Sequence, residues 1–391
     1  MTQQLTTDKT AQLRNIAAQF ACSGEVVSVE PLGNGNINNT YLVTTGETRS
    51  AVTGAIAPAR FVLQRINNQV FCQPEQVITN LAVVSQHLQQ QATAATHQSD
   101  RRWETPRILP TRSRQNFWRD ETGSYWRALS FIENSQVKET VESAAHAREV
   151  GYGLAKFHSL INTLSVDQLA DTLVGFHITP SYLARYQQVL QTQAARSRSQ
   201  DPDQQASLRY CMNFIRQRQQ WAHVLEEAKA TGDLQLRPIH GDPKVNNILL
   251  SERGQAISLI DLDTLKPGLI HYDIGDCLRS GCNRLGEETK QWQQVTFDTD
   301  LARAMLEGYL SIAKDFLTQA DYRYLYDAIR LIAFELGLRF FTDYLSGDIY
   351  FKVNQPNHNL TRALVQFKLT ESIEHQADTI KAIIQTLQQE S

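Results

Sequence analysis

The spacing of apolar residues changes along the chain from short runs to a helical period. In the first third, short runs rich in β-branched and aromatic residues predict strands. From Val141 onward, apolar residues mostly recur every three or four positions, which predicts helices. We therefore expect an α+β fold with a small antiparallel-sheet lobe over 1–134 and a mainly helical lobe over 135–391. The predicted strands are 26–30, 40–44, 60–66, a hairpin within 117–132, and a second hairpin of 248–250 with 257–260; the predicted helices are 7–21, 74–90, 141–160, 182–190, 206–229, 300–316, 321–344 and 360–388.

A polar loop leads into the second of these hairpins. It carries His240, Asp242, Lys244 and Asn247, and Asp261 directly follows the second strand of the hairpin. Three oxygen-bearing side chains, those of Asp242, Asn247 and Asp261, are therefore expected to converge. Mg²⁺ prefers such hard oxygen ligands and keeps waters and substrate phosphates in its remaining positions.

The spacing within this loop predicts phosphoryl transfer. An Asp two residues after a His, a Lys two further on and an Asn five after the Asp form the layout of a protein-kinase catalytic loop. In that layout the Asp accepts the proton of the attacking hydroxyl, and the Asn and a later Asp hold the metal. Asp242 is thus the predicted base, Asn247 and Asp261 are the predicted Mg²⁺ ligands, and Lys244 is a point charge near the transferred group. A purely structural loop is disfavoured because one loop rarely carries all these residues by accident.

Composition narrows the class of protein. The 391 residues carry a net charge of −3, so no basic field is available to attract nucleic acid. No apolar run approaches the length of a membrane span, and the first residues lack the pattern of a signal peptide. The five cysteines show no Cys-x-x-Cys spacing, so a disulfide scaffold and a zinc site are not expected. We expect a cytoplasmic enzyme, monomeric or homodimeric, that acts on a small molecule.

Four motifs also carry a family resemblance. They are His240-Gly241-Asp242, Asn247, Leu259-Ile260-Asp261 and Tyr272-Asp273-Ile274-Gly275. They resemble those of the aminoglycoside phosphotransferase and choline kinase superfamily, whose members are small-molecule kinases with a bilobal protein-kinase-like fold. Longer stretches are similar to N-acetylhexosamine 1-kinases, and the resemblance runs from about residue 28 to about residue 370. These stretches are 33–41, 63–67, 260–264, 267–268 and 338–345.

The resemblance implies that ATP binds with Mg²⁺. A hairpin containing Gly33, Asn34 and Gly35 would let backbone N–H groups approach the phosphates without interference from side chains. The next strand, where a protein kinase has a phosphate-pairing lysine, offers Gln64 and Arg65 instead. Neighbouring strand residues face opposite sides, so only one of the two can point at the phosphates. We favour Arg65 because phosphates require a cation, with Gln64 as the alternative.

The kinase layout also implies a hinge and a partner for the strand cation. Backbone groups of Phe131, Ile132 and Glu133 would meet the adenine edge. In the helix after the cation, Glu75 lies at the very start, while the more central Asn80 cannot form an ion pair. Whether a glutamate partner exists is left open.

The closer resemblance implies an N-acetylhexosamine acceptor, phosphorylated at its anomeric hydroxyl. Arg339 and Tyr350 correspond to an Arg and a Tyr that line the sugar site of the resembled kinases. Asn36 stands where those kinases have a histidine, and its amide could still hold a hydroxyl. Asp263 or Asp276 is a further expected substrate contact.

Other residues are expected to support the site. By the resemblance, Asp273 would hold the catalytic loop, and His240 would be structural. His158, on the helical stripe before the loop, is expected to be a hydrogen-bonded core residue. The alternative role for Arg339 is an ion pair with Glu335, one helical turn earlier.

Two other classes of function stay open. One is a kinase for another small alcohol that resembles choline, homoserine or an aminoglycoside. An aminoglycoside site would need a dense acidic patch and a choline site an aromatic cage, and the sequence indicates neither. The other is a nucleotide-binding pseudokinase scaffold, against which the complete set of Asp242, Asn247 and Asp261 argues.

Overall fold

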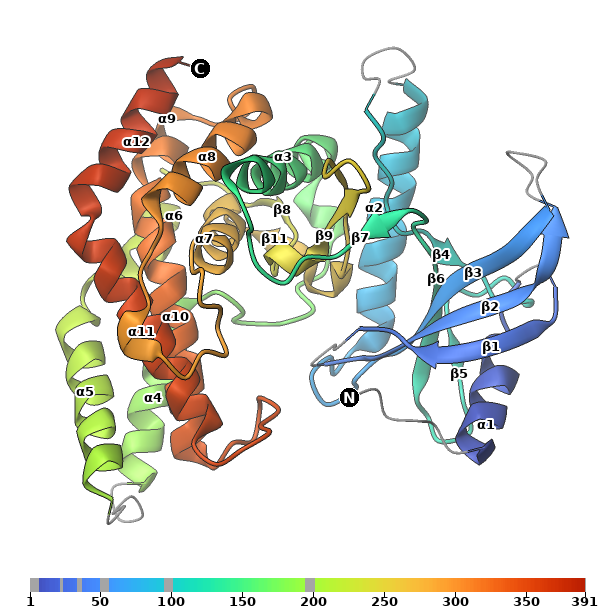
Figure 1. Cartoon of the computed structure of the whole chain (residues 1–391), viewed down its shortest axis with the longest axis horizontal. Helices are drawn as coiled ribbons and strands as arrows, with labels where there is room; N and C mark the ends of the chain where they lie inside the picture. The colour runs from blue at the N-terminus through green and yellow to red at the C-terminus, as the bar shows by residue number, and fades with distance from the viewer. Residues whose placement is uncertain are drawn as a thin grey trace. The chain divides into compact units, whose positions relative to one another are not determined.

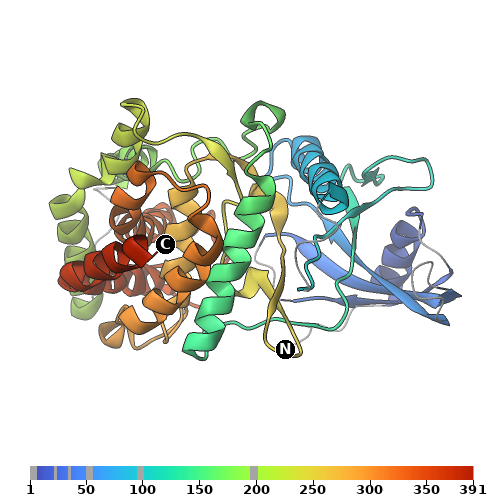
Figure 2. The same cartoon turned by 90° about the horizontal axis from the view of Figure 1, so that it is seen from above.

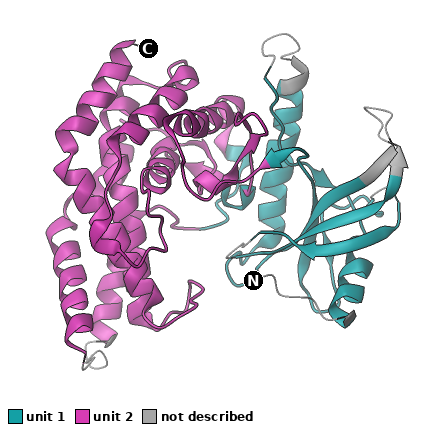
Figure 3. Ribbon diagram, in the orientation of Figure 1, with its two compact units in different colours: residues 1–135, 167–173, 262–265 teal, residues 136–166, 174–261, 266–391 magenta. Residues whose placement is uncertain are grey.

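The computed structural model describes residues 7–21, 24–33, 37–49, 56–94, 101–193 and 201–390. The chain divides into two compact units (Figure 3). Unit 1 comprises Met1–Ser135, Asp167–Leu173 and Leu262–Leu265, and unit 2 comprises Gln136–Val166, Val174–Asp261 and Lys266–Ser391. An antiparallel sheet in the N-terminal part and helices in the C-terminal part confirm the predicted α+β class.

Unit 1 is built on an antiparallel sheet in the order β1-β2-β3-β6-β4, with β5 paired to the start of β6. Strand side chains alternate between faces, and on one face Val43, Phe61 and Leu63 pack with Leu13 and Ile16 of α1. Figure 1 shows α1 beside this sheet. The elements are α1 (Thr7–Ala17), β1 (Val26–Pro31), β2 (Asn39–Arg49), β3 (Ile56–Arg65), α2 (Pro74–Ala94), β4 (Ile108–Leu109), β5 (Trp118–Arg119) and β6 (Tyr125–Ser130), and β7 (Ser135–Gln136) follows at the boundary of the units.

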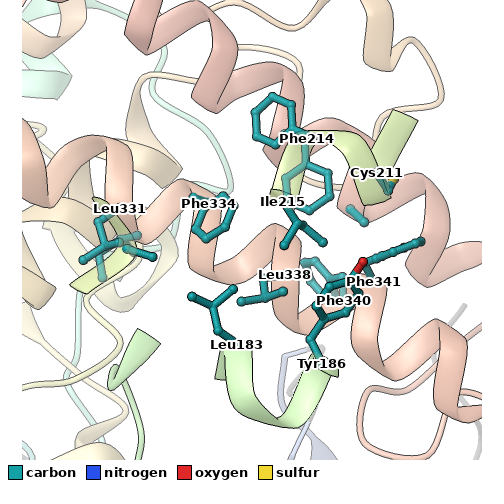
Figure 4. Close-up of a cluster of buried hydrophobic side chains, with 14 of the residues drawn as sticks. Leu183, Tyr186, Cys211, Phe214, Ile215, Leu331, Phe334, Leu338, Phe340 and Phe341 are labelled. Carbon is teal, nitrogen blue, oxygen red and sulfur yellow. The ribbon is translucent and has the colours of Figure 1, made fainter. Parts of the chain in front are cut away.

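Unit 2 is mainly helical, and α10 is its most buried long helix. Because α10 is apolar on most sides, it is enclosed by other helices. Its Phe334 packs against Phe214 of α5 and Phe367 of α11, and Leu338 lies in the same cluster (Figure 4). None of the helices in the described ranges combines the length and the apolar character needed to cross a membrane. The helices are α3 (Ala144–Ile161), α4 (Thr179–Gln193), α5 (Pro202–Arg218), α6 (Val224–Ala230), α7 (Ile270–Gly281), α8 (Thr299–Ala313), α9 (Gln319–Arg323), α10 (Leu325–Ser346), α11 (His358–His375) and α12 (Ala377–Glu390).

Two small antiparallel pairs in unit 2 carry the polar loop. Strand β8 (Arg237–Ile239) pairs with β11 (Lys266–Gly268), and β9 (Ile248–Ser251) pairs with β10 (Ala256–Leu259). The predicted hairpin after the loop is thus confirmed. Short 3₁₀ turns η3 (Val245–Asn247) and η4 (Leu262–Thr264) precede β9 and follow Asp261.

Three predicted helices are interrupted, and one was missed. The stretch 206–229 contains a 3₁₀ turn at Trp221–His223, 321–344 breaks at Tyr324, and 360–388 breaks at Gln376. Apolar spacing continues across each break, so periodicity alone does not reveal it. Helix α7, which begins just before the Tyr272 motif, was not predicted because its residues were interpreted as a motif rather than as an element.

Helices α3 and α8 run side by side and cross closely (Figures 1 and 2). At the crossing, a Cβ added to Gly151 would lie 1.9 Å from the Met305 carbonyl oxygen. A Cβ added to Gly308 would lie 1.9 Å from the Arg148 carbonyl oxygen. Each helix therefore needs glycine where it meets the backbone of the other.

Candidate active site

The predicted catalytic loop is an ordered turn of unit 2 between β8 and η3. The Asp242 carboxylate lies 2.9 Å from Lys244 Nζ, and the Lys244 backbone N–H donates to the Asp242 carbonyl oxygen at 2.9 Å. The charge of Asp242, with a smaller contribution from Asp261, raises the pKa of Lys244. Lys244 is therefore a permanent cation beside a carboxylate that is 27 % exposed. This pair can accept a proton and neutralise negative charge at the same place.

The two predicted metal ligands are joined through the β9–β10 hairpin. Asn247 Nδ2 donates to the Asp242 carbonyl oxygen at 2.8 Å, so the amide oxygen is the atom that can bind a cation. The Ile260 backbone N–H donates to the Asn247 carbonyl oxygen at 2.8 Å, which ties Asn247 to the residue before Asp261. Asp261 has a left-handed backbone with φ of 65°. An amide oxygen and a carboxylate are donors that suit Mg²⁺.

Asp273 of α7 holds the start of the loop. Its carboxylate accepts hydrogen bonds from the backbone N–H groups of His240 at 2.7 Å and Gly241 at 2.8 Å, and it contacts His158 Nε2 at 2.8 Å. Burial raises the pKa of a carboxyl group, but these hydrogen bonds and the nearby histidines outweigh burial and lower the pKa of Asp273. His158 Nδ1 lies 3.0 Å from the Tyr309 hydroxyl, so His158 is a hydrogen-bonded core residue, as predicted.

His240 supports the loop from inside. Its Nε2 lies 2.9 Å from the Ile260 carbonyl oxygen, and its Nδ1 accepts from the Asp242 backbone N–H at 3.2 Å. A carbonyl oxygen only accepts, so the proton is on Nε2 and the ring is neutral. Burial lowers the pKa of His240, in agreement with a neutral ring. One neutral ring thus joins Asp242 to Ile260, the residue before Asp261.

Sequence reasoning missed a second histidine that holds the loop. His177 Nε2 lies 2.7 Å from the Gly241 carbonyl oxygen, and its Nδ1 lies 2.9 Å from Glu335 of α10. His177 precedes Gly241 by 64 residues and belongs to no regular motif, so no spacing links the two.

In unit 1 the buried cation beside Gln64 is Arg127 of β6, whereas Arg65 is exposed. The Gln64 Oε1 atom accepts hydrogen bonds from Arg127 Nε at 3.0 Å and from Arg127 Nη2 at 2.7 Å. Arg65 is exposed and lies on the strand face of Leu63, which packs toward α1. The structure therefore does not support the preference for Arg65. Helix α1 packs on the face of β3 that carries Leu63 and Arg65, and the sequence of the strand alone does not reveal which face α1 covers. Arg127 is buried, and within the described part of the chain its Nη1 has no hydrogen-bond partner.

The two acidic candidates for substrate contact are both engaged inside the protein. Asp263 is buried in unit 1, where it forms an ion pair with Arg127 and accepts a hydrogen bond from Asn38. Asp276 is buried in unit 2 and pairs with Arg279 at 2.8 Å. The carboxylate of Asp263 neutralises a buried guanidinium, which favours a structural role over the substrate contact that the sequence predicts.

No glutamate of α2 pairs with a strand cation in the described part of unit 1. Glu75 accepts a hydrogen bond from the Tyr125 hydroxyl at 2.9 Å. Asn80 instead braces two segments with its amide, which donates to the carbonyl oxygens of Ala170 and Leu265 at 2.8 Å and accepts from the Ala170 N–H at 2.9 Å. The sequence leaves open whether a glutamate of this helix pairs with a strand cation. At the central position of the helix the structure has Asn80, whose amide binds backbone groups instead.

The predicted hinge is described in full, and the predicted glycine hairpin only in part. The Glu133 carbonyl oxygen accepts from Arg102 at 2.6 Å, and the Ile132 carbonyl oxygen accepts from Ser135 at 2.7 Å. Phe131 lies under the Arg60 guanidinium at 4.7 Å. In the hairpin, Gly33 has a left-handed φ of 70°, whereas Asn34, Gly35 and Asn36 lie outside the described residues.

Arg339 lies in a box of four aromatic rings in unit 2. Its guanidinium carbon is 5.0 Å from the centre of Phe176, 5.1 Å from Tyr182, 6.0 Å from Tyr350 and 5.4 Å from Phe351. Burial alone would lower the pKa of Arg339. The electrostatic effect of its neighbours outweighs burial and raises this pKa; the neighbours are Tyr182, Tyr350, Glu335 and Asp242. Burial raises the pKa of Tyr182 to about 12.

The alternative pairing of Arg339 with Glu335 does not occur. The Glu335 carboxylate is bound by His177 at 2.9 Å and by the Thr179 hydroxyl at 2.6 Å. Arg339 is therefore held mainly by aromatic faces, and the predicted neighbour Tyr350 is one of them.

Comparison with known proteins identifies the family and the fold. Residues 28–311 match the model of the phosphotransferase enzyme family. A solved aminoglycoside phosphotransferase from Alicyclobacillus acidocaldarius is 16% identical, with a TM-score of 0.55, over 100% of this chain and 97% of that chain. A microcompartment-associated aminopropanol kinase is 16% identical with a TM-score of 0.58, over 95% and 98%. A choline kinase from Cryptosporidium parvum is 13% identical with a TM-score of 0.55, over 97% and 98%. The predicted superfamily and its kinase-like fold are thereby confirmed.

Proposed function

Because the chain belongs to the phosphotransferase enzyme family, we propose that it is an ATP- and Mg²⁺-dependent kinase for the anomeric hydroxyl of an N-acetylhexosamine. The observation that carries the kinase proposal is the loop in which Asp242 and Lys244 lie 2.9 Å apart beside Asn247. Pseudokinase function is disfavoured, since every residue of this loop that a kinase needs is present and supported.

In this proposal each loop residue has one task. Asp242 orients the acceptor hydroxyl and takes its proton, while Lys244 offsets the charge of the transferred group. Asn247 and Asp261 would hold Mg²⁺, which neutralises phosphate charge when bound. Phosphoryl transfer asks a protein mainly for positioning and charge, so this small set is sufficient.

We assign the phosphate-binding cation to Arg127. Its Nη1 is the buried donor for which the described residues provide no acceptor, whereas Nε and Nη2 are held by Gln64 and Asp263. A phosphate oxygen would satisfy that donor, and a fixed guanidinium suits phosphate geometry. The backbone of the hairpin with Gly33, Asn34 and Gly35, and that of Phe131 to Glu133, remain the proposed contacts for phosphates and adenine.

The aromatic box supports a neutral acceptor rather than a cationic one. Choline and aminoglycosides carry positive charge, and the box already encloses the Arg339 guanidinium. A sugar hydroxyl or an N-acetyl oxygen can accept from Arg339, and an apolar sugar face can lie on an aromatic ring such as Tyr350, which is 49 % exposed. The proposed substrate contacts are therefore Arg339 and Tyr350, with Asn36 and Asp242.

A substrate screen tests this proposal. The protein is incubated with Mg²⁺ and ATP and with free hexoses, N-acetylhexosamines, choline, amino alcohols or aminoglycosides, and both ADP and phosphorylated product are measured. We expect N-acetylhexosamine 1-phosphate and an acceptor KM raised at least about tenfold by Arg339→Ala, the loss of one hydrogen bond to a charged group. Turnover of choline or an aminoglycoside without turnover of any sugar would refute the acceptor assignment but not kinase activity.

A further inference from the structure

His177 is a buried histidine that the proposed chemistry does not use. It is 4 % exposed and lies in unit 2 just before α4, where it contacts the catalytic loop and α10. Both of its ring nitrogens face oxygen atoms. One is the Gly241 carbonyl oxygen at 2.7 Å, and the other belongs to Glu335 at 2.9 Å.

These partners require protons on both nitrogens. A carbonyl oxygen can only accept, so Nε2 carries a proton. The Glu335 carboxylate also accepts, and its second oxygen already receives the Thr179 hydroxyl at 2.6 Å. The arrangement is therefore an imidazolium between a carboxylate and a carbonyl group, which makes both hydrogen bonds charge-assisted.

The surroundings agree with a charged ring. Burial alone would lower the pKa of His177, but Glu335 first, then Asp276 and the Gly241 carbonyl group, outweigh burial and raise it. Tyr272 of α7 stacks on the ring with centroids 5.3 Å apart, and the pKa of Tyr272 is raised, so it stays neutral. Tyr182 of α4 has a pKa raised to about 12 and also stays neutral. Two cations border the same segment: Lys266 Nζ donates to the Phe176 carbonyl oxygen at 3.4 Å, and the Arg339 guanidinium lies over the Phe176 ring.

The backbone at both ends of the contact between His177 and Gly241 has left-handed φ angles, which are strained for a non-glycine residue. His177 has a left-handed φ of 65°, and Gly241 has a φ of 88°. A non-glycine residue in this region is strained and persists only where surrounding contacts hold it. Here the contacts are the two hydrogen bonds and the ring stack.

We infer that His177 is a positioning residue for phosphoryl transfer, and that its imidazolium, fixed by Glu335, holds the Gly241 carbonyl group and thereby sets the place of Asp242. Asp273 binds the Gly241 N–H at 2.8 Å, so the peptide groups on both sides of Gly241 are each held by a buried side chain. This inference rests on the proposed kinase function. It adds a charge requirement at a residue that touches neither substrate nor metal.

The same segment also borders the proposed acceptor site. Phe176 and Tyr182, on either side of His177 in sequence, form two walls of the box around Arg339. Glu335 and Arg339 are one turn apart on α10. Displacement of His177 is therefore expected to alter the orientation of the acceptor hydroxyl as well as that of Asp242, and to affect kcat more than nucleotide binding.

The test combines three variants with steady-state kinetics. His177→Phe keeps a ring for stacking and removes both donors, His177→Gln keeps one neutral donor, and Glu335→Gln removes the carboxylate that fixes the charge. We expect kcat to fall about ten- to hundredfold, the range for a displaced reacting group, while the KM for ATP changes less than about twofold. Glu374→Gln is the matched control, because it removes a glutamate from the Arg218 ion pair at 2.5 Å in the same unit and should leave kcat unchanged.

The dependence of kcat on pH separates positioning from simple structural support. The imidazolium is present below its raised pKa, so kcat of the native protein should fall as pH rises through that value. Glu335→Gln should move this alkaline limb to lower pH, and His177→Gln should abolish it. The raised pKa of Lys244 keeps its own deprotonation at higher pH. If the variants melt at the native temperature and keep native kcat, or if the limb does not move, the inference is wrong.

Nuclear magnetic resonance of the ring nitrogens gives a readout that needs no substrate. Native protein labelled with ¹⁵N-histidine should show a signal at pH 7 with both nitrogens protonated, and this signal should be absent in His177→Phe and unchanged in Glu374→Gln. A neutral His177 ring at pH 7 would overturn the inference even if the variants failed to fold. If native protein shows no phosphoryl transfer to any acceptor while the charged ring is observed, the kinase proposal fails. The assignment of a charged His177 ring between Glu335 and Gly241 is then retained.

Discussion

Replacement of Asp273 by asparagine should destabilise unit 2 and show how firmly the catalytic loop is held. The carboxylate serves three donors, the backbone N–H groups of His240 and Gly241 and the ring of His158. Asparagine has one acceptor oxygen, and in either orientation its NH₂ group faces at least one of these donors. We expect a loss of about 2–4 kcal/mol, the value of a hydrogen bond to a charged acceptor together with a buried donor left without a partner.

Urea denaturation followed by fluorescence and circular dichroism measures this loss. Asp315→Asn is the control, because Asp315 is exposed in the same unit and should change the free energy of unfolding by less than about 0.5 kcal/mol. The lowered pKa of Asp273 gives a second signature. Its stabilisation is present above the unfolded pKa of about 3.9 and is lost as pH falls through the lower folded value. The difference between native protein and Asp273→Asn should therefore shrink in acid.

Two results would refute this reasoning. A loss below about 0.5 kcal/mol at pH 7 would mean that the loop does not depend on the carboxylate. A difference that stays constant from pH 7 to strongly acid conditions would mean that the charge of Asp273 is not what stabilises the folded state.

Three further outcomes follow from the site. Asp242→Asn should lower kcat at least about a hundredfold with little change in the KM for ATP, and near-native turnover would remove Asp242 from the role of base. Asn247→Ala should raise the Mg²⁺ concentration needed for half-maximal rate; an unchanged titration would exclude its amide oxygen as a ligand. Arg127→Met should raise the KM for ATP at least about tenfold and leave the KM for the acceptor nearly unchanged, whereas Arg65→Met, its exposed control, should change neither. An equal effect of the two substitutions would contradict the assignment of Arg127.

Local spacing was enough to predict the hairpin after the polar loop and much of the fold. The loop and its hairpin lie within one short stretch, so the positions of Asp242, Asn247 and Asp261 follow from offsets along the chain. Strand alternation likewise predicts that Gln64 and Arg65 face opposite sides. It cannot say which side is covered, because that depends on how α1 packs onto the sheet.

The residues that the sequence did not reveal come from distant parts of the chain. His177 and Glu335 are 158 residues apart, and each has an ordinary local context. Arg127 offered a weak signal, since it is a cation in the middle of an apolar predicted strand, but its partner Asp263 lies 136 residues away. Buried polar contacts of this kind are fixed by tertiary packing, and no periodicity encodes them.

The close crossing of α3 and α8 has a consequence for how the protein tolerates variation. Gly151 and Gly308 allow the two helices to approach, and the next residue, Tyr309, reaches His158, which contacts Asp273. A single added methyl group at either glycine must push the helices apart and lengthen that chain of contacts. In a saturation mutagenesis screen for activity, these two glycines should be as intolerant as the residues of the catalytic loop. Their substitution by serine or alanine would be read as loss of an active-site residue, although neither glycine can touch a substrate.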